Sequence, residues 1–306
     1  MSWEKPFHEG ELKAQKLAGE TAEAEANSAM IDGEIMAGAL NFVRGQEMAV
    51  AGSRDEKGRR WASFLFGRKG FLQPIDRKTL RIDLDPAEID ADDPLWKNIE
   101  GDAKIGLLVI ELATRRRLRI NGQVHRIGDT LELEVLESYP NCPKYITRRQ
   151  IKFSDKPSGA SKPLKLRGSQ LNEQQQEIIR VADTLFMATG HPKRGADASH
   201  RGGRPGFVQI IDDATLRIPD YSGNSMFNTF GNLLVDPHVG LLIPEFEADR
   251  ALQITGTAKI EWHDKDPEDA SGGTHRFVVI RLDEWREHPL PVAVKSTFID
   301  YSPYDP

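Results

Sequence analysis

Cysteine is almost absent from this sequence, and so is any long hydrophobic run. Cys142 is the only cysteine among 306 residues, which excludes an internal disulfide, a cysteine-based zinc site and an iron–sulfur cluster. The longest apolar runs, such as IGLLVI at 105–110, have the length of a strand and are too short to span a bilayer. The charged N-terminal segment lacks the apolar centre of a signal peptide. We therefore predict a cytoplasmic protein without a membrane partner.

Excess positive charge and nucleotide-binding motifs are missing as well. Lysine and arginine number 41 against 47 acidic residues, and the net charge of −6 argues against binding to nucleic acid. The eight histidines show no HExxH or other paired ligand spacing, so we predict no metal site. Neither GxGxxG nor GxxxxGK[ST] occurs, so neither a Rossmann nor a P-loop site is indicated.

The chain contains two similar halves. The segment ASFLFGRKGFLQPIDRKTLRI, at 62–82, recurs as ASHRGGRPGFVQIIDDATLRI at 198–218, an offset of 136 residues. Two further matches, of 98–112 with 232–246 and of 118–124 with 252–258, have an offset of 134. A near-constant offset indicates two copies of one fold, with two residues lost from the second copy.

Each copy is rich in short runs of Val, Ile, Leu, Phe and Thr that end at Gly, Pro or Asp-Asp turns, and each follows a helical pattern, at 33–45 and 169–183. This pattern predicts a mainly β protein with some helix, one small barrel per copy. The predicted division is a helical arm at 1–32, a first barrel at 33–136, a linker at 137–168, a second barrel at 169–285 and a tail at 286–306.

These segments resemble a known family. ADASHRGGRPGFVQIIDDATLRIPDYSGNSMFNTFGNLLVDPHVGLLI, together with YPNCPKYI and ATRRRLRINGQV, is similar to the pyridoxamine 5'-phosphate oxidase-like, FMN-binding split β-barrel proteins, and to the subgroup with two fused barrels. The resemblance implies a six-stranded Greek-key barrel and FMN in the groove between two barrels. The two copies would form this pair within one chain; the alternative is a homodimer in which each barrel pairs with its equivalent in another chain.

The polar loop DYSGNSMFNTFGN, at 220–232, is the candidate cradle for the FMN phosphate. Gly223 allows close backbone approach, and amides at a helix N-terminus favour an anion. The predicted contacts in this loop are Asp220, Asn224, Ser225, Asn228 and Thr229. The alternative is a turn that only caps a helix.

The loop has no positive charge, so the counter-charge for a phosphate must come from another segment. SHRGGR, at 199–204, supplies candidates, and an arginine can bind phosphate through two parallel hydrogen bonds. The following strand would run along the flavin ring in the family. The predicted contacts here are Ser199, His200, Arg201, Arg204, Phe207, Val208 and Gln209. A solvated basic loop is the alternative.

The first copy differs where the second has the polar loop. Six acids stand there, and they would repel a phosphate: Asp83, Asp85, Glu88, Asp90, Asp92 and Asp93. We therefore expect the first copy to contribute only the opposite wall, through Trp61 and Arg117, with Arg115, Arg116 and Arg119 as further candidates. An exposed basic edge strand is equally compatible with these arginines.

The residues and the resemblance together favour an FMN-dependent oxidoreductase. It would pass hydride or electrons between NAD(P)H, or a small organic substrate, and an acceptor. No residue stands out as a catalytic acid or base. The alternative is a module that stores flavin, binds haem or another tetrapyrrole, or serves as a regulatory scaffold.

The acidic segment of the first copy leads to a prediction about stoichiometry. We expect one FMN per chain, because only the second copy offers a neutral phosphate loop. Flavin released by denaturation, counted against protein concentration, measures the ratio. A ratio near two would contradict the proposed difference between the copies.

Overall fold

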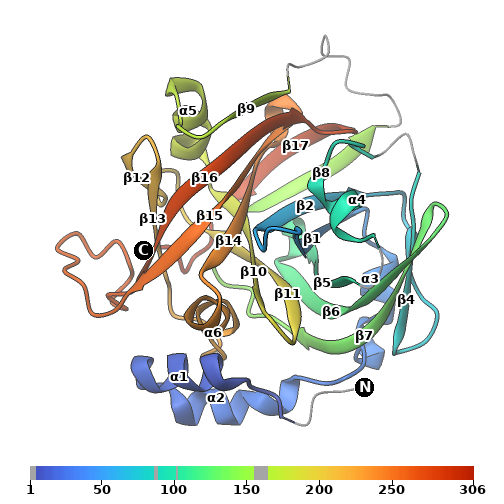
Figure 1. Cartoon of the computed structure of the whole chain (residues 1–306), viewed down its shortest axis with the longest axis horizontal. Coiled ribbons are helices and arrows are strands. Elements are labelled where there is room, and N and C mark those ends of the chain that lie inside the picture. The colour runs from blue at the N-terminus through green and yellow to red at the C-terminus, as the bar shows by residue number, and fades with distance from the viewer. Residues whose placement is uncertain (1–4, 86–88, 101–102, 155–164) are drawn as a thin grey trace.

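The structure, a computed structural model, describes residues 5–85, 89–100, 103–154 and 165–306. Glu88 and residues 155–164 of the predicted linker lie outside these ranges. Antiparallel strands dominate the described chain, and they form two large sheets and a small two-stranded one (Figure 1).

The first sheet has the strand order β2-β1-β5-β6-β7-β4-β3. Its strands are β1 (Met48–Arg54), β2 (Arg60–Phe66), β3 (Leu72–Pro74), β4 (Thr79–Asp83), β5 (Ala103–Glu111), β6 (Arg116–Ile127) and β7 (Thr130–Pro140).

The second sheet repeats this order strand for strand, as β11-β10-β14-β15-β16-β13-β12. Its strands are β10 (Thr184–His191), β11 (Gly195–Gly202), β12 (Gln209–Asp212), β13 (Thr215–Pro219), β14 (His238–Glu245), β15 (Arg250–Glu261) and β16 (Phe277–Pro289). The chain is therefore mainly β and consists of two tandem split barrels, as predicted.

The alternation of side chains explains how each sheet folds around its own core. In the shared TLRI segment, Leu80 and Ile82 of β4 are buried, and so are Leu216 and Ile218 of β13. The residues between them face outward, because successive side chains of a strand point to opposite faces. Each barrel has its own apolar cluster, and a third cluster combines side chains of both barrels, such as Val50 and Phe186.

Two equivalent glycines let the barrels touch backbone to backbone. A Cβ on Gly106 of β5 would lie 2.4 Å from the Cα of Asp197 on β11. A Cβ on Gly240 of β14 would lie 2.5 Å from the carbonyl oxygen of Arg60 on β2. The two barrels thus form an intramolecular pair with approximate two-fold symmetry.

The helices connect strands or cover barrel ends. The predicted helical pattern at 169–183 contains α5 (Glu173–Val181), which Asn172 caps by accepting a hydrogen bond from the Gln174 amide. A short helix precedes the central GLL strand of each copy, α4 (Pro94–Asn98) before β5 and α6 (Asn228–Val235) before β14. The predicted helix at 33–45 is reduced to α3 (Leu40–Arg44) and a short 3-10 turn before it. None of the helices in the described part of the chain is long and apolar enough to cross a membrane.

The segments outside the two barrels are more structured than the sequence indicated. The predicted boundaries at 136 and 285 fall inside β7 and β16. The predicted linker contributes β8 (Arg148–Ser154) and β9 (Leu166–Gly168), and the predicted tail contributes β17 (Ala293–Asp300), which pairs with β8. The N-terminal arm forms α1 (Glu9–Ala18) and α2 (Thr21–Asn27) and lies against α6 (Figure 1).

The contact between the barrels leads to a stability prediction. Gly106→Ala should lower the free energy of unfolding by about 1–3 kcal/mol, because the added methyl group overlaps the Asp197 backbone. Gly38→Ala is the control, since no atom lies within 4 Å of its Cβ position. Urea unfolding measures both. Equal stability of the two variants would mean that the contact between the barrels accommodates the added methyl group at no cost in free energy.

Candidate functional site

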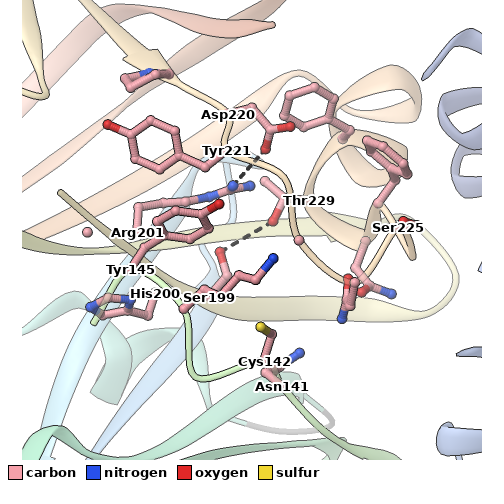
Figure 2. Close-up of a pocket in the computed structure, with 18 of the residues that line it drawn as sticks. Asn141, Cys142, Tyr145, Ser199, His200, Arg201, Asp220, Tyr221, Ser225 and Thr229 are labelled. Carbon is pink, nitrogen blue, oxygen red and sulfur yellow. Dashed lines mark hydrogen bonds and ion pairs between the residues drawn. The ribbon is translucent and has the colours of Figure 1, made fainter. Parts of the chain in front are cut away.

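A pocket lies between the two barrels (Figure 2). Its walls are β11 and the 220–230 segment of the second barrel, β6 of the first barrel, and the segment that follows β7. It contains about 840 Å³ of unfilled space, including its open mouth. Ten predicted site residues line it: Arg117, Ser199, His200, Arg201, Phe207, Asp220, Asn224, Ser225, Asn228 and Thr229.

One end of the pocket is the N-terminus of α6. Phe227 occupies the N-cap position with a left-handed backbone (φ 58°), and no side chain caps the helix. The first amides of an α-helix have no partner within the helix, so here they remain available to a ligand. Thr229 of the first turn also places its hydroxyl oxygen 3.3 Å from that of Ser199 on β11 (Figure 2). The start of α6 and two buried hydroxyl groups therefore lie at the same end of the pocket, and such groups are typical of anion sites.

In the first barrel a carboxylate of the protein itself occupies the corresponding place. Asp93 caps α4 by accepting a hydrogen bond from the Leu95 amide at 2.8 Å, and another from the Ser63 hydroxyl at 2.6 Å. By the repeat offsets, Leu95 corresponds to Thr229 and Ser63 to Ser199. Asp93 is buried, and burial raises its pKa. A carboxyl group of the protein itself thus fills the helix start of the first copy, which is more specific than the general repulsion by six acids that we predicted.

Two arginines of β6 enter the pocket from the first barrel with different partners. Arg119 donates to Asp197 at 3.0 Å and to the Tyr139 hydroxyl at 2.9 Å. Burial opposes the charge of Arg119, but these two partners outweigh it, and its pKa is raised. Arg117 donates to the Cys142 carbonyl at 2.8 Å, and no carboxylate among the described residues pairs with it. Burial, reinforced by the neighbouring Arg119, lowers the pKa of Arg117 to about 9.

His200 lies beside Arg117 and is neutral. Its Nδ1 atom is 3.3 Å from a guanidinium nitrogen of Arg117, which can only donate, so the ring proton belongs on Nε2. Burial and then Arg117 hold the pKa of His200 well below its usual value. The pocket therefore has a positive inner wall that gains no charge from His200 near neutral pH.

A chain of ion pairs crosses the loop side of the pocket. Arg201 contacts Asp220 at 2.8 Å, and Asp220 also accepts from Arg276 at 3.0 Å. Arg276 contacts Glu20 of the N-terminal arm at 2.8 Å. The charge of Arg201, which we predicted as the counter-charge for phosphate, is therefore already shared with Asp220 (Figure 2).

The mouth is aromatic and was only partly predicted. The rings of Tyr145 and Tyr221 contact each other at a tilt, with centroids 4.8 Å apart, and the Tyr145 hydroxyl donates to the Ser222 carbonyl. Burial raises the pKa of both tyrosines. The lining residues that we did not predict include Glu20, Asn141, Cys142, Lys144, Tyr145, Tyr221, Phe227 and Arg276. The only sequence signals for them were the YPNCPKYI segment and the positions of Tyr221 and Phe227 within the polar loop.

Four predicted contacts lie elsewhere. Arg204 is exposed and lies over the Tyr301 ring, and Val208 belongs to the core of the second barrel. Gln209 on β12 accepts a hydrogen bond from Arg217. Trp61 on β2 lines a separate groove beside α4 and donates to Asp55.

The position of Trp61 follows from the two-fold relation of the barrels. β2 is the counterpart of β11, so Trp61 occupies in the first barrel the place that Asp197 has in the second. The alternation along β6 explains why Arg117 and Arg119 share the pocket face. Arg115 precedes β6 and pairs with Asp300, and Arg116 lies over the Phe42 ring.

A possible metal-ligand trio, His8, Glu9 and His191, lies beside the arm, with its ligand atoms within 4.8 Å of one another. The Nδ1 atom of each ring accepts a backbone N–H bond, from Gly10 in one case and from Lys193 and Arg194 in the other. A neutral ring then carries its proton on Nε2, where a metal would have to bind. The trio is better explained as a hydrogen-bonded contact between the N-terminal arm and the second barrel.

Comparison with known proteins finds a family model that matches the second barrel. Residues 171–289 match the family model described as pyridoxamine 5'-phosphate oxidase. No curated protein sequence matches the chain. Among solved structures, a proposed pyridoxamine 5'-phosphate oxidase from Lactobacillus delbrueckii is 17% identical, with a TM-score of 0.32; the match covers 40% of this chain and 97% of that one.

Two further solved structures show similar coverage. General stress protein 26 from Bacillus anthracis is 14% identical, over 40% of this chain and 95% of that one, with a TM-score of 0.28. A FAD-binding protein from Mesorhizobium loti is 10% identical, over 40% and 98%, with a TM-score of 0.27. Each match covers a share of this chain close to one barrel.

The contrast between the two β6 arginines can be tested without any ligand. Arg117→Met should leave the free energy of unfolding unchanged or raise it, because it removes a buried charge that has no carboxylate partner. Arg119→Met should lower it by about 3 kcal/mol, because Asp197 loses its cation. Urea unfolding of the ligand-free protein measures both. Equal losses would show that Arg117 is a structural residue.

Proposed function

Since the chain belongs to the pyridoxamine 5'-phosphate oxidase-like split β-barrel family, we propose that its inter-barrel pocket binds one FMN and that the protein is a flavin-dependent oxidoreductase. The observation that supports this proposal most strongly is the uncapped N-terminus of α6 beside Ser199 and Thr229. The equivalent position in the first barrel holds the carboxylate of Asp93, which acts as an internal stand-in for an anion.

The charges and hydrogen-bond donors around the pocket support the proposal of a phosphorylated ligand. Free amides at the start of α6 and the two hydroxyl groups would hold the phosphate, with the helix dipole in favour of its charge. Arg117 would supply a cation on the opposite wall, where its own barrel offers it no carboxylate. Arg201 and Arg276 would add less, because Asp220 and Glu20 already neutralise them.

The rest of the pocket suits a planar ring. Tyr145, Tyr221, Phe207 and Phe227 offer apolar and aromatic surface in the pocket lining, as small-molecule sites typically do. A bound flavin supplies hydride and electron transfer by itself. The protein would bind and orient it and leave the mouth open to a donor such as NAD(P)H or a small organic substrate.

The reaction itself is a separate part of the proposal. His200 is the only histidine in the pocket lining, and its buried, neutral ring bonds to Arg117. This arrangement orients Arg117 and offers no evident acid or base. Bleaching of the flavin spectrum by NADH or NADPH would support an oxidoreductase, and a flavin that no donor reduces would favour storage.

A matched pair of substitutions tests the phosphate position. Thr229→Asp places a negative charge beside Ser199, so we expect FMN affinity to fall at least a hundredfold. Thr229→Asn has nearly the same shape without the charge, and we expect a loss of no more than about tenfold. Quenching of flavin fluorescence during titration gives both affinities.

Riboflavin, which lacks the phosphate, is the control ligand for the same titrations. Its affinity should be similar in the two variants, because no ligand charge meets the new carboxylate. Equal FMN affinity for Thr229→Asp and Thr229→Asn would place the phosphate elsewhere. Absence of FMN binding by the unmodified protein would refute the proposed function.

A further inference from the structure

The N-terminal arm contacts the pocket loop at almost every residue between 224 and 228. Asn27 donates to the Asn224 carbonyl at 2.9 Å, and Gln15 donates to the Met226 carbonyl at 3.2 Å. Two carboxylates of the arm also accept from the loop: Glu20 from the Ser225 hydroxyl at 2.7 Å and Glu11 from the Asn228 amide group at 2.6 Å. The arm and the barrels thus hold the loop between them.

The two carbonyl contacts determine where the loop amides point. In a trans peptide the N–H and C=O bonds point in opposite directions. Because the arm holds the carbonyls of Asn224 and Met226, the amides of Ser225 and Phe227 point away from the arm, and both residues line the pocket. Neither amide donates to another described residue. They extend the row of free amides at the start of α6.

The loop also has a strained backbone that requires external support. Ser225 and Phe227 have φ values of 60° and 58°, a region that costs non-glycine residues free energy unless their surroundings enforce it. Gln15 and Met226 are both fully buried, so the contact between them excludes water. The arm is therefore one of the elements that enforce this conformation.

Close helix packing fixes the arm itself. A Cβ on Gly10 of α1 would lie 2.1 Å from the Gly231 carbonyl oxygen of α6, so the two helices touch through backbone atoms. A residue larger than glycine at position 10 would push α1 away from α6. Docking of the arm and the conformation of the loop thus depend on one rigid contact.

We propose that the N-terminal arm is a positioning element of the anion site, in which Gln15 and Asn27 turn the Ser225 and Phe227 amides toward the ligand. The proposal rests on the function proposed above. It implies that docking of the arm and binding of a phosphate group favour each other by the same factor, as thermodynamic linkage requires.

Hydrogen exchange of the α1 amides tests this coupling. We expect bound FMN to slow their exchange about tenfold in the unmodified protein, because these amides exchange through local opening of the arm. Inorganic phosphate, compared with potassium chloride at equal ionic strength, should slow it in the same direction. Protection by phosphate without binding of FMN would refute the flavin proposal and keep this one. No protection by either ligand would overturn the role of the arm.

Substitutions in α1 provide the reciprocal measurement. Gln15→Met removes the donor to Met226 without a change of charge, and Gly10→Ala displaces the helix through a different contact. Both should weaken FMN about tenfold and leave riboflavin affinity unchanged, whereas a purely structural role would weaken both ligands. Leu12→Ala, at an exposed position of the same helix, should behave as the unmodified protein. Unchanged FMN affinity in both α1 variants would also overturn the proposal.

Discussion

The backbone contact between the two barrels is the constraint on which the pocket depends. Gly106 and Gly240 allow a central strand of each barrel to touch an edge strand of the other. This contact brings β6 of the first barrel opposite β11 of the second, and with it Arg117 and Arg119 opposite His200 and Asp197. Without the close approach neither barrel alone would provide a two-sided pocket.

The two copies have the same strand order but differ at the start of the helix that precedes the central strand. The strands keep the shared pattern because each barrel must bury the same alternating face. The helix start is free of that requirement, and there the copies diverge: Asp93 caps α4, whereas Phe227 leaves α6 uncapped. A symmetric scaffold thus yields one helix start that a side chain caps and one that no side chain caps.

The distribution of buried charge indicates which groups serve the fold and which are available to a ligand. Arg119, Arg201 and Arg276 each have a carboxylate partner, so their charges are balanced before any ligand binds. Arg117 has only carbonyl and imidazole partners among the described residues. A buried charge without a counter-ion is unfavourable for stability, and such residues cluster where function requires them.

The sequence by itself determined the two β-rich copies, their strands, a helix within 169–183 and the polar loop, because hydrophobic alternation, turn residues and caps are local signals. The repeat also indicated that the copies differ at 83–98. Only the tertiary structure decided that Trp61 faces a separate groove beside α4, that Asp220 neutralises Arg201, and that Glu20 and Gln15 reach the loop from about 200 residues away in the sequence. These relations depend on how barrels and arm pack together, and no local pattern encodes the contact partner of a side chain across such a separation.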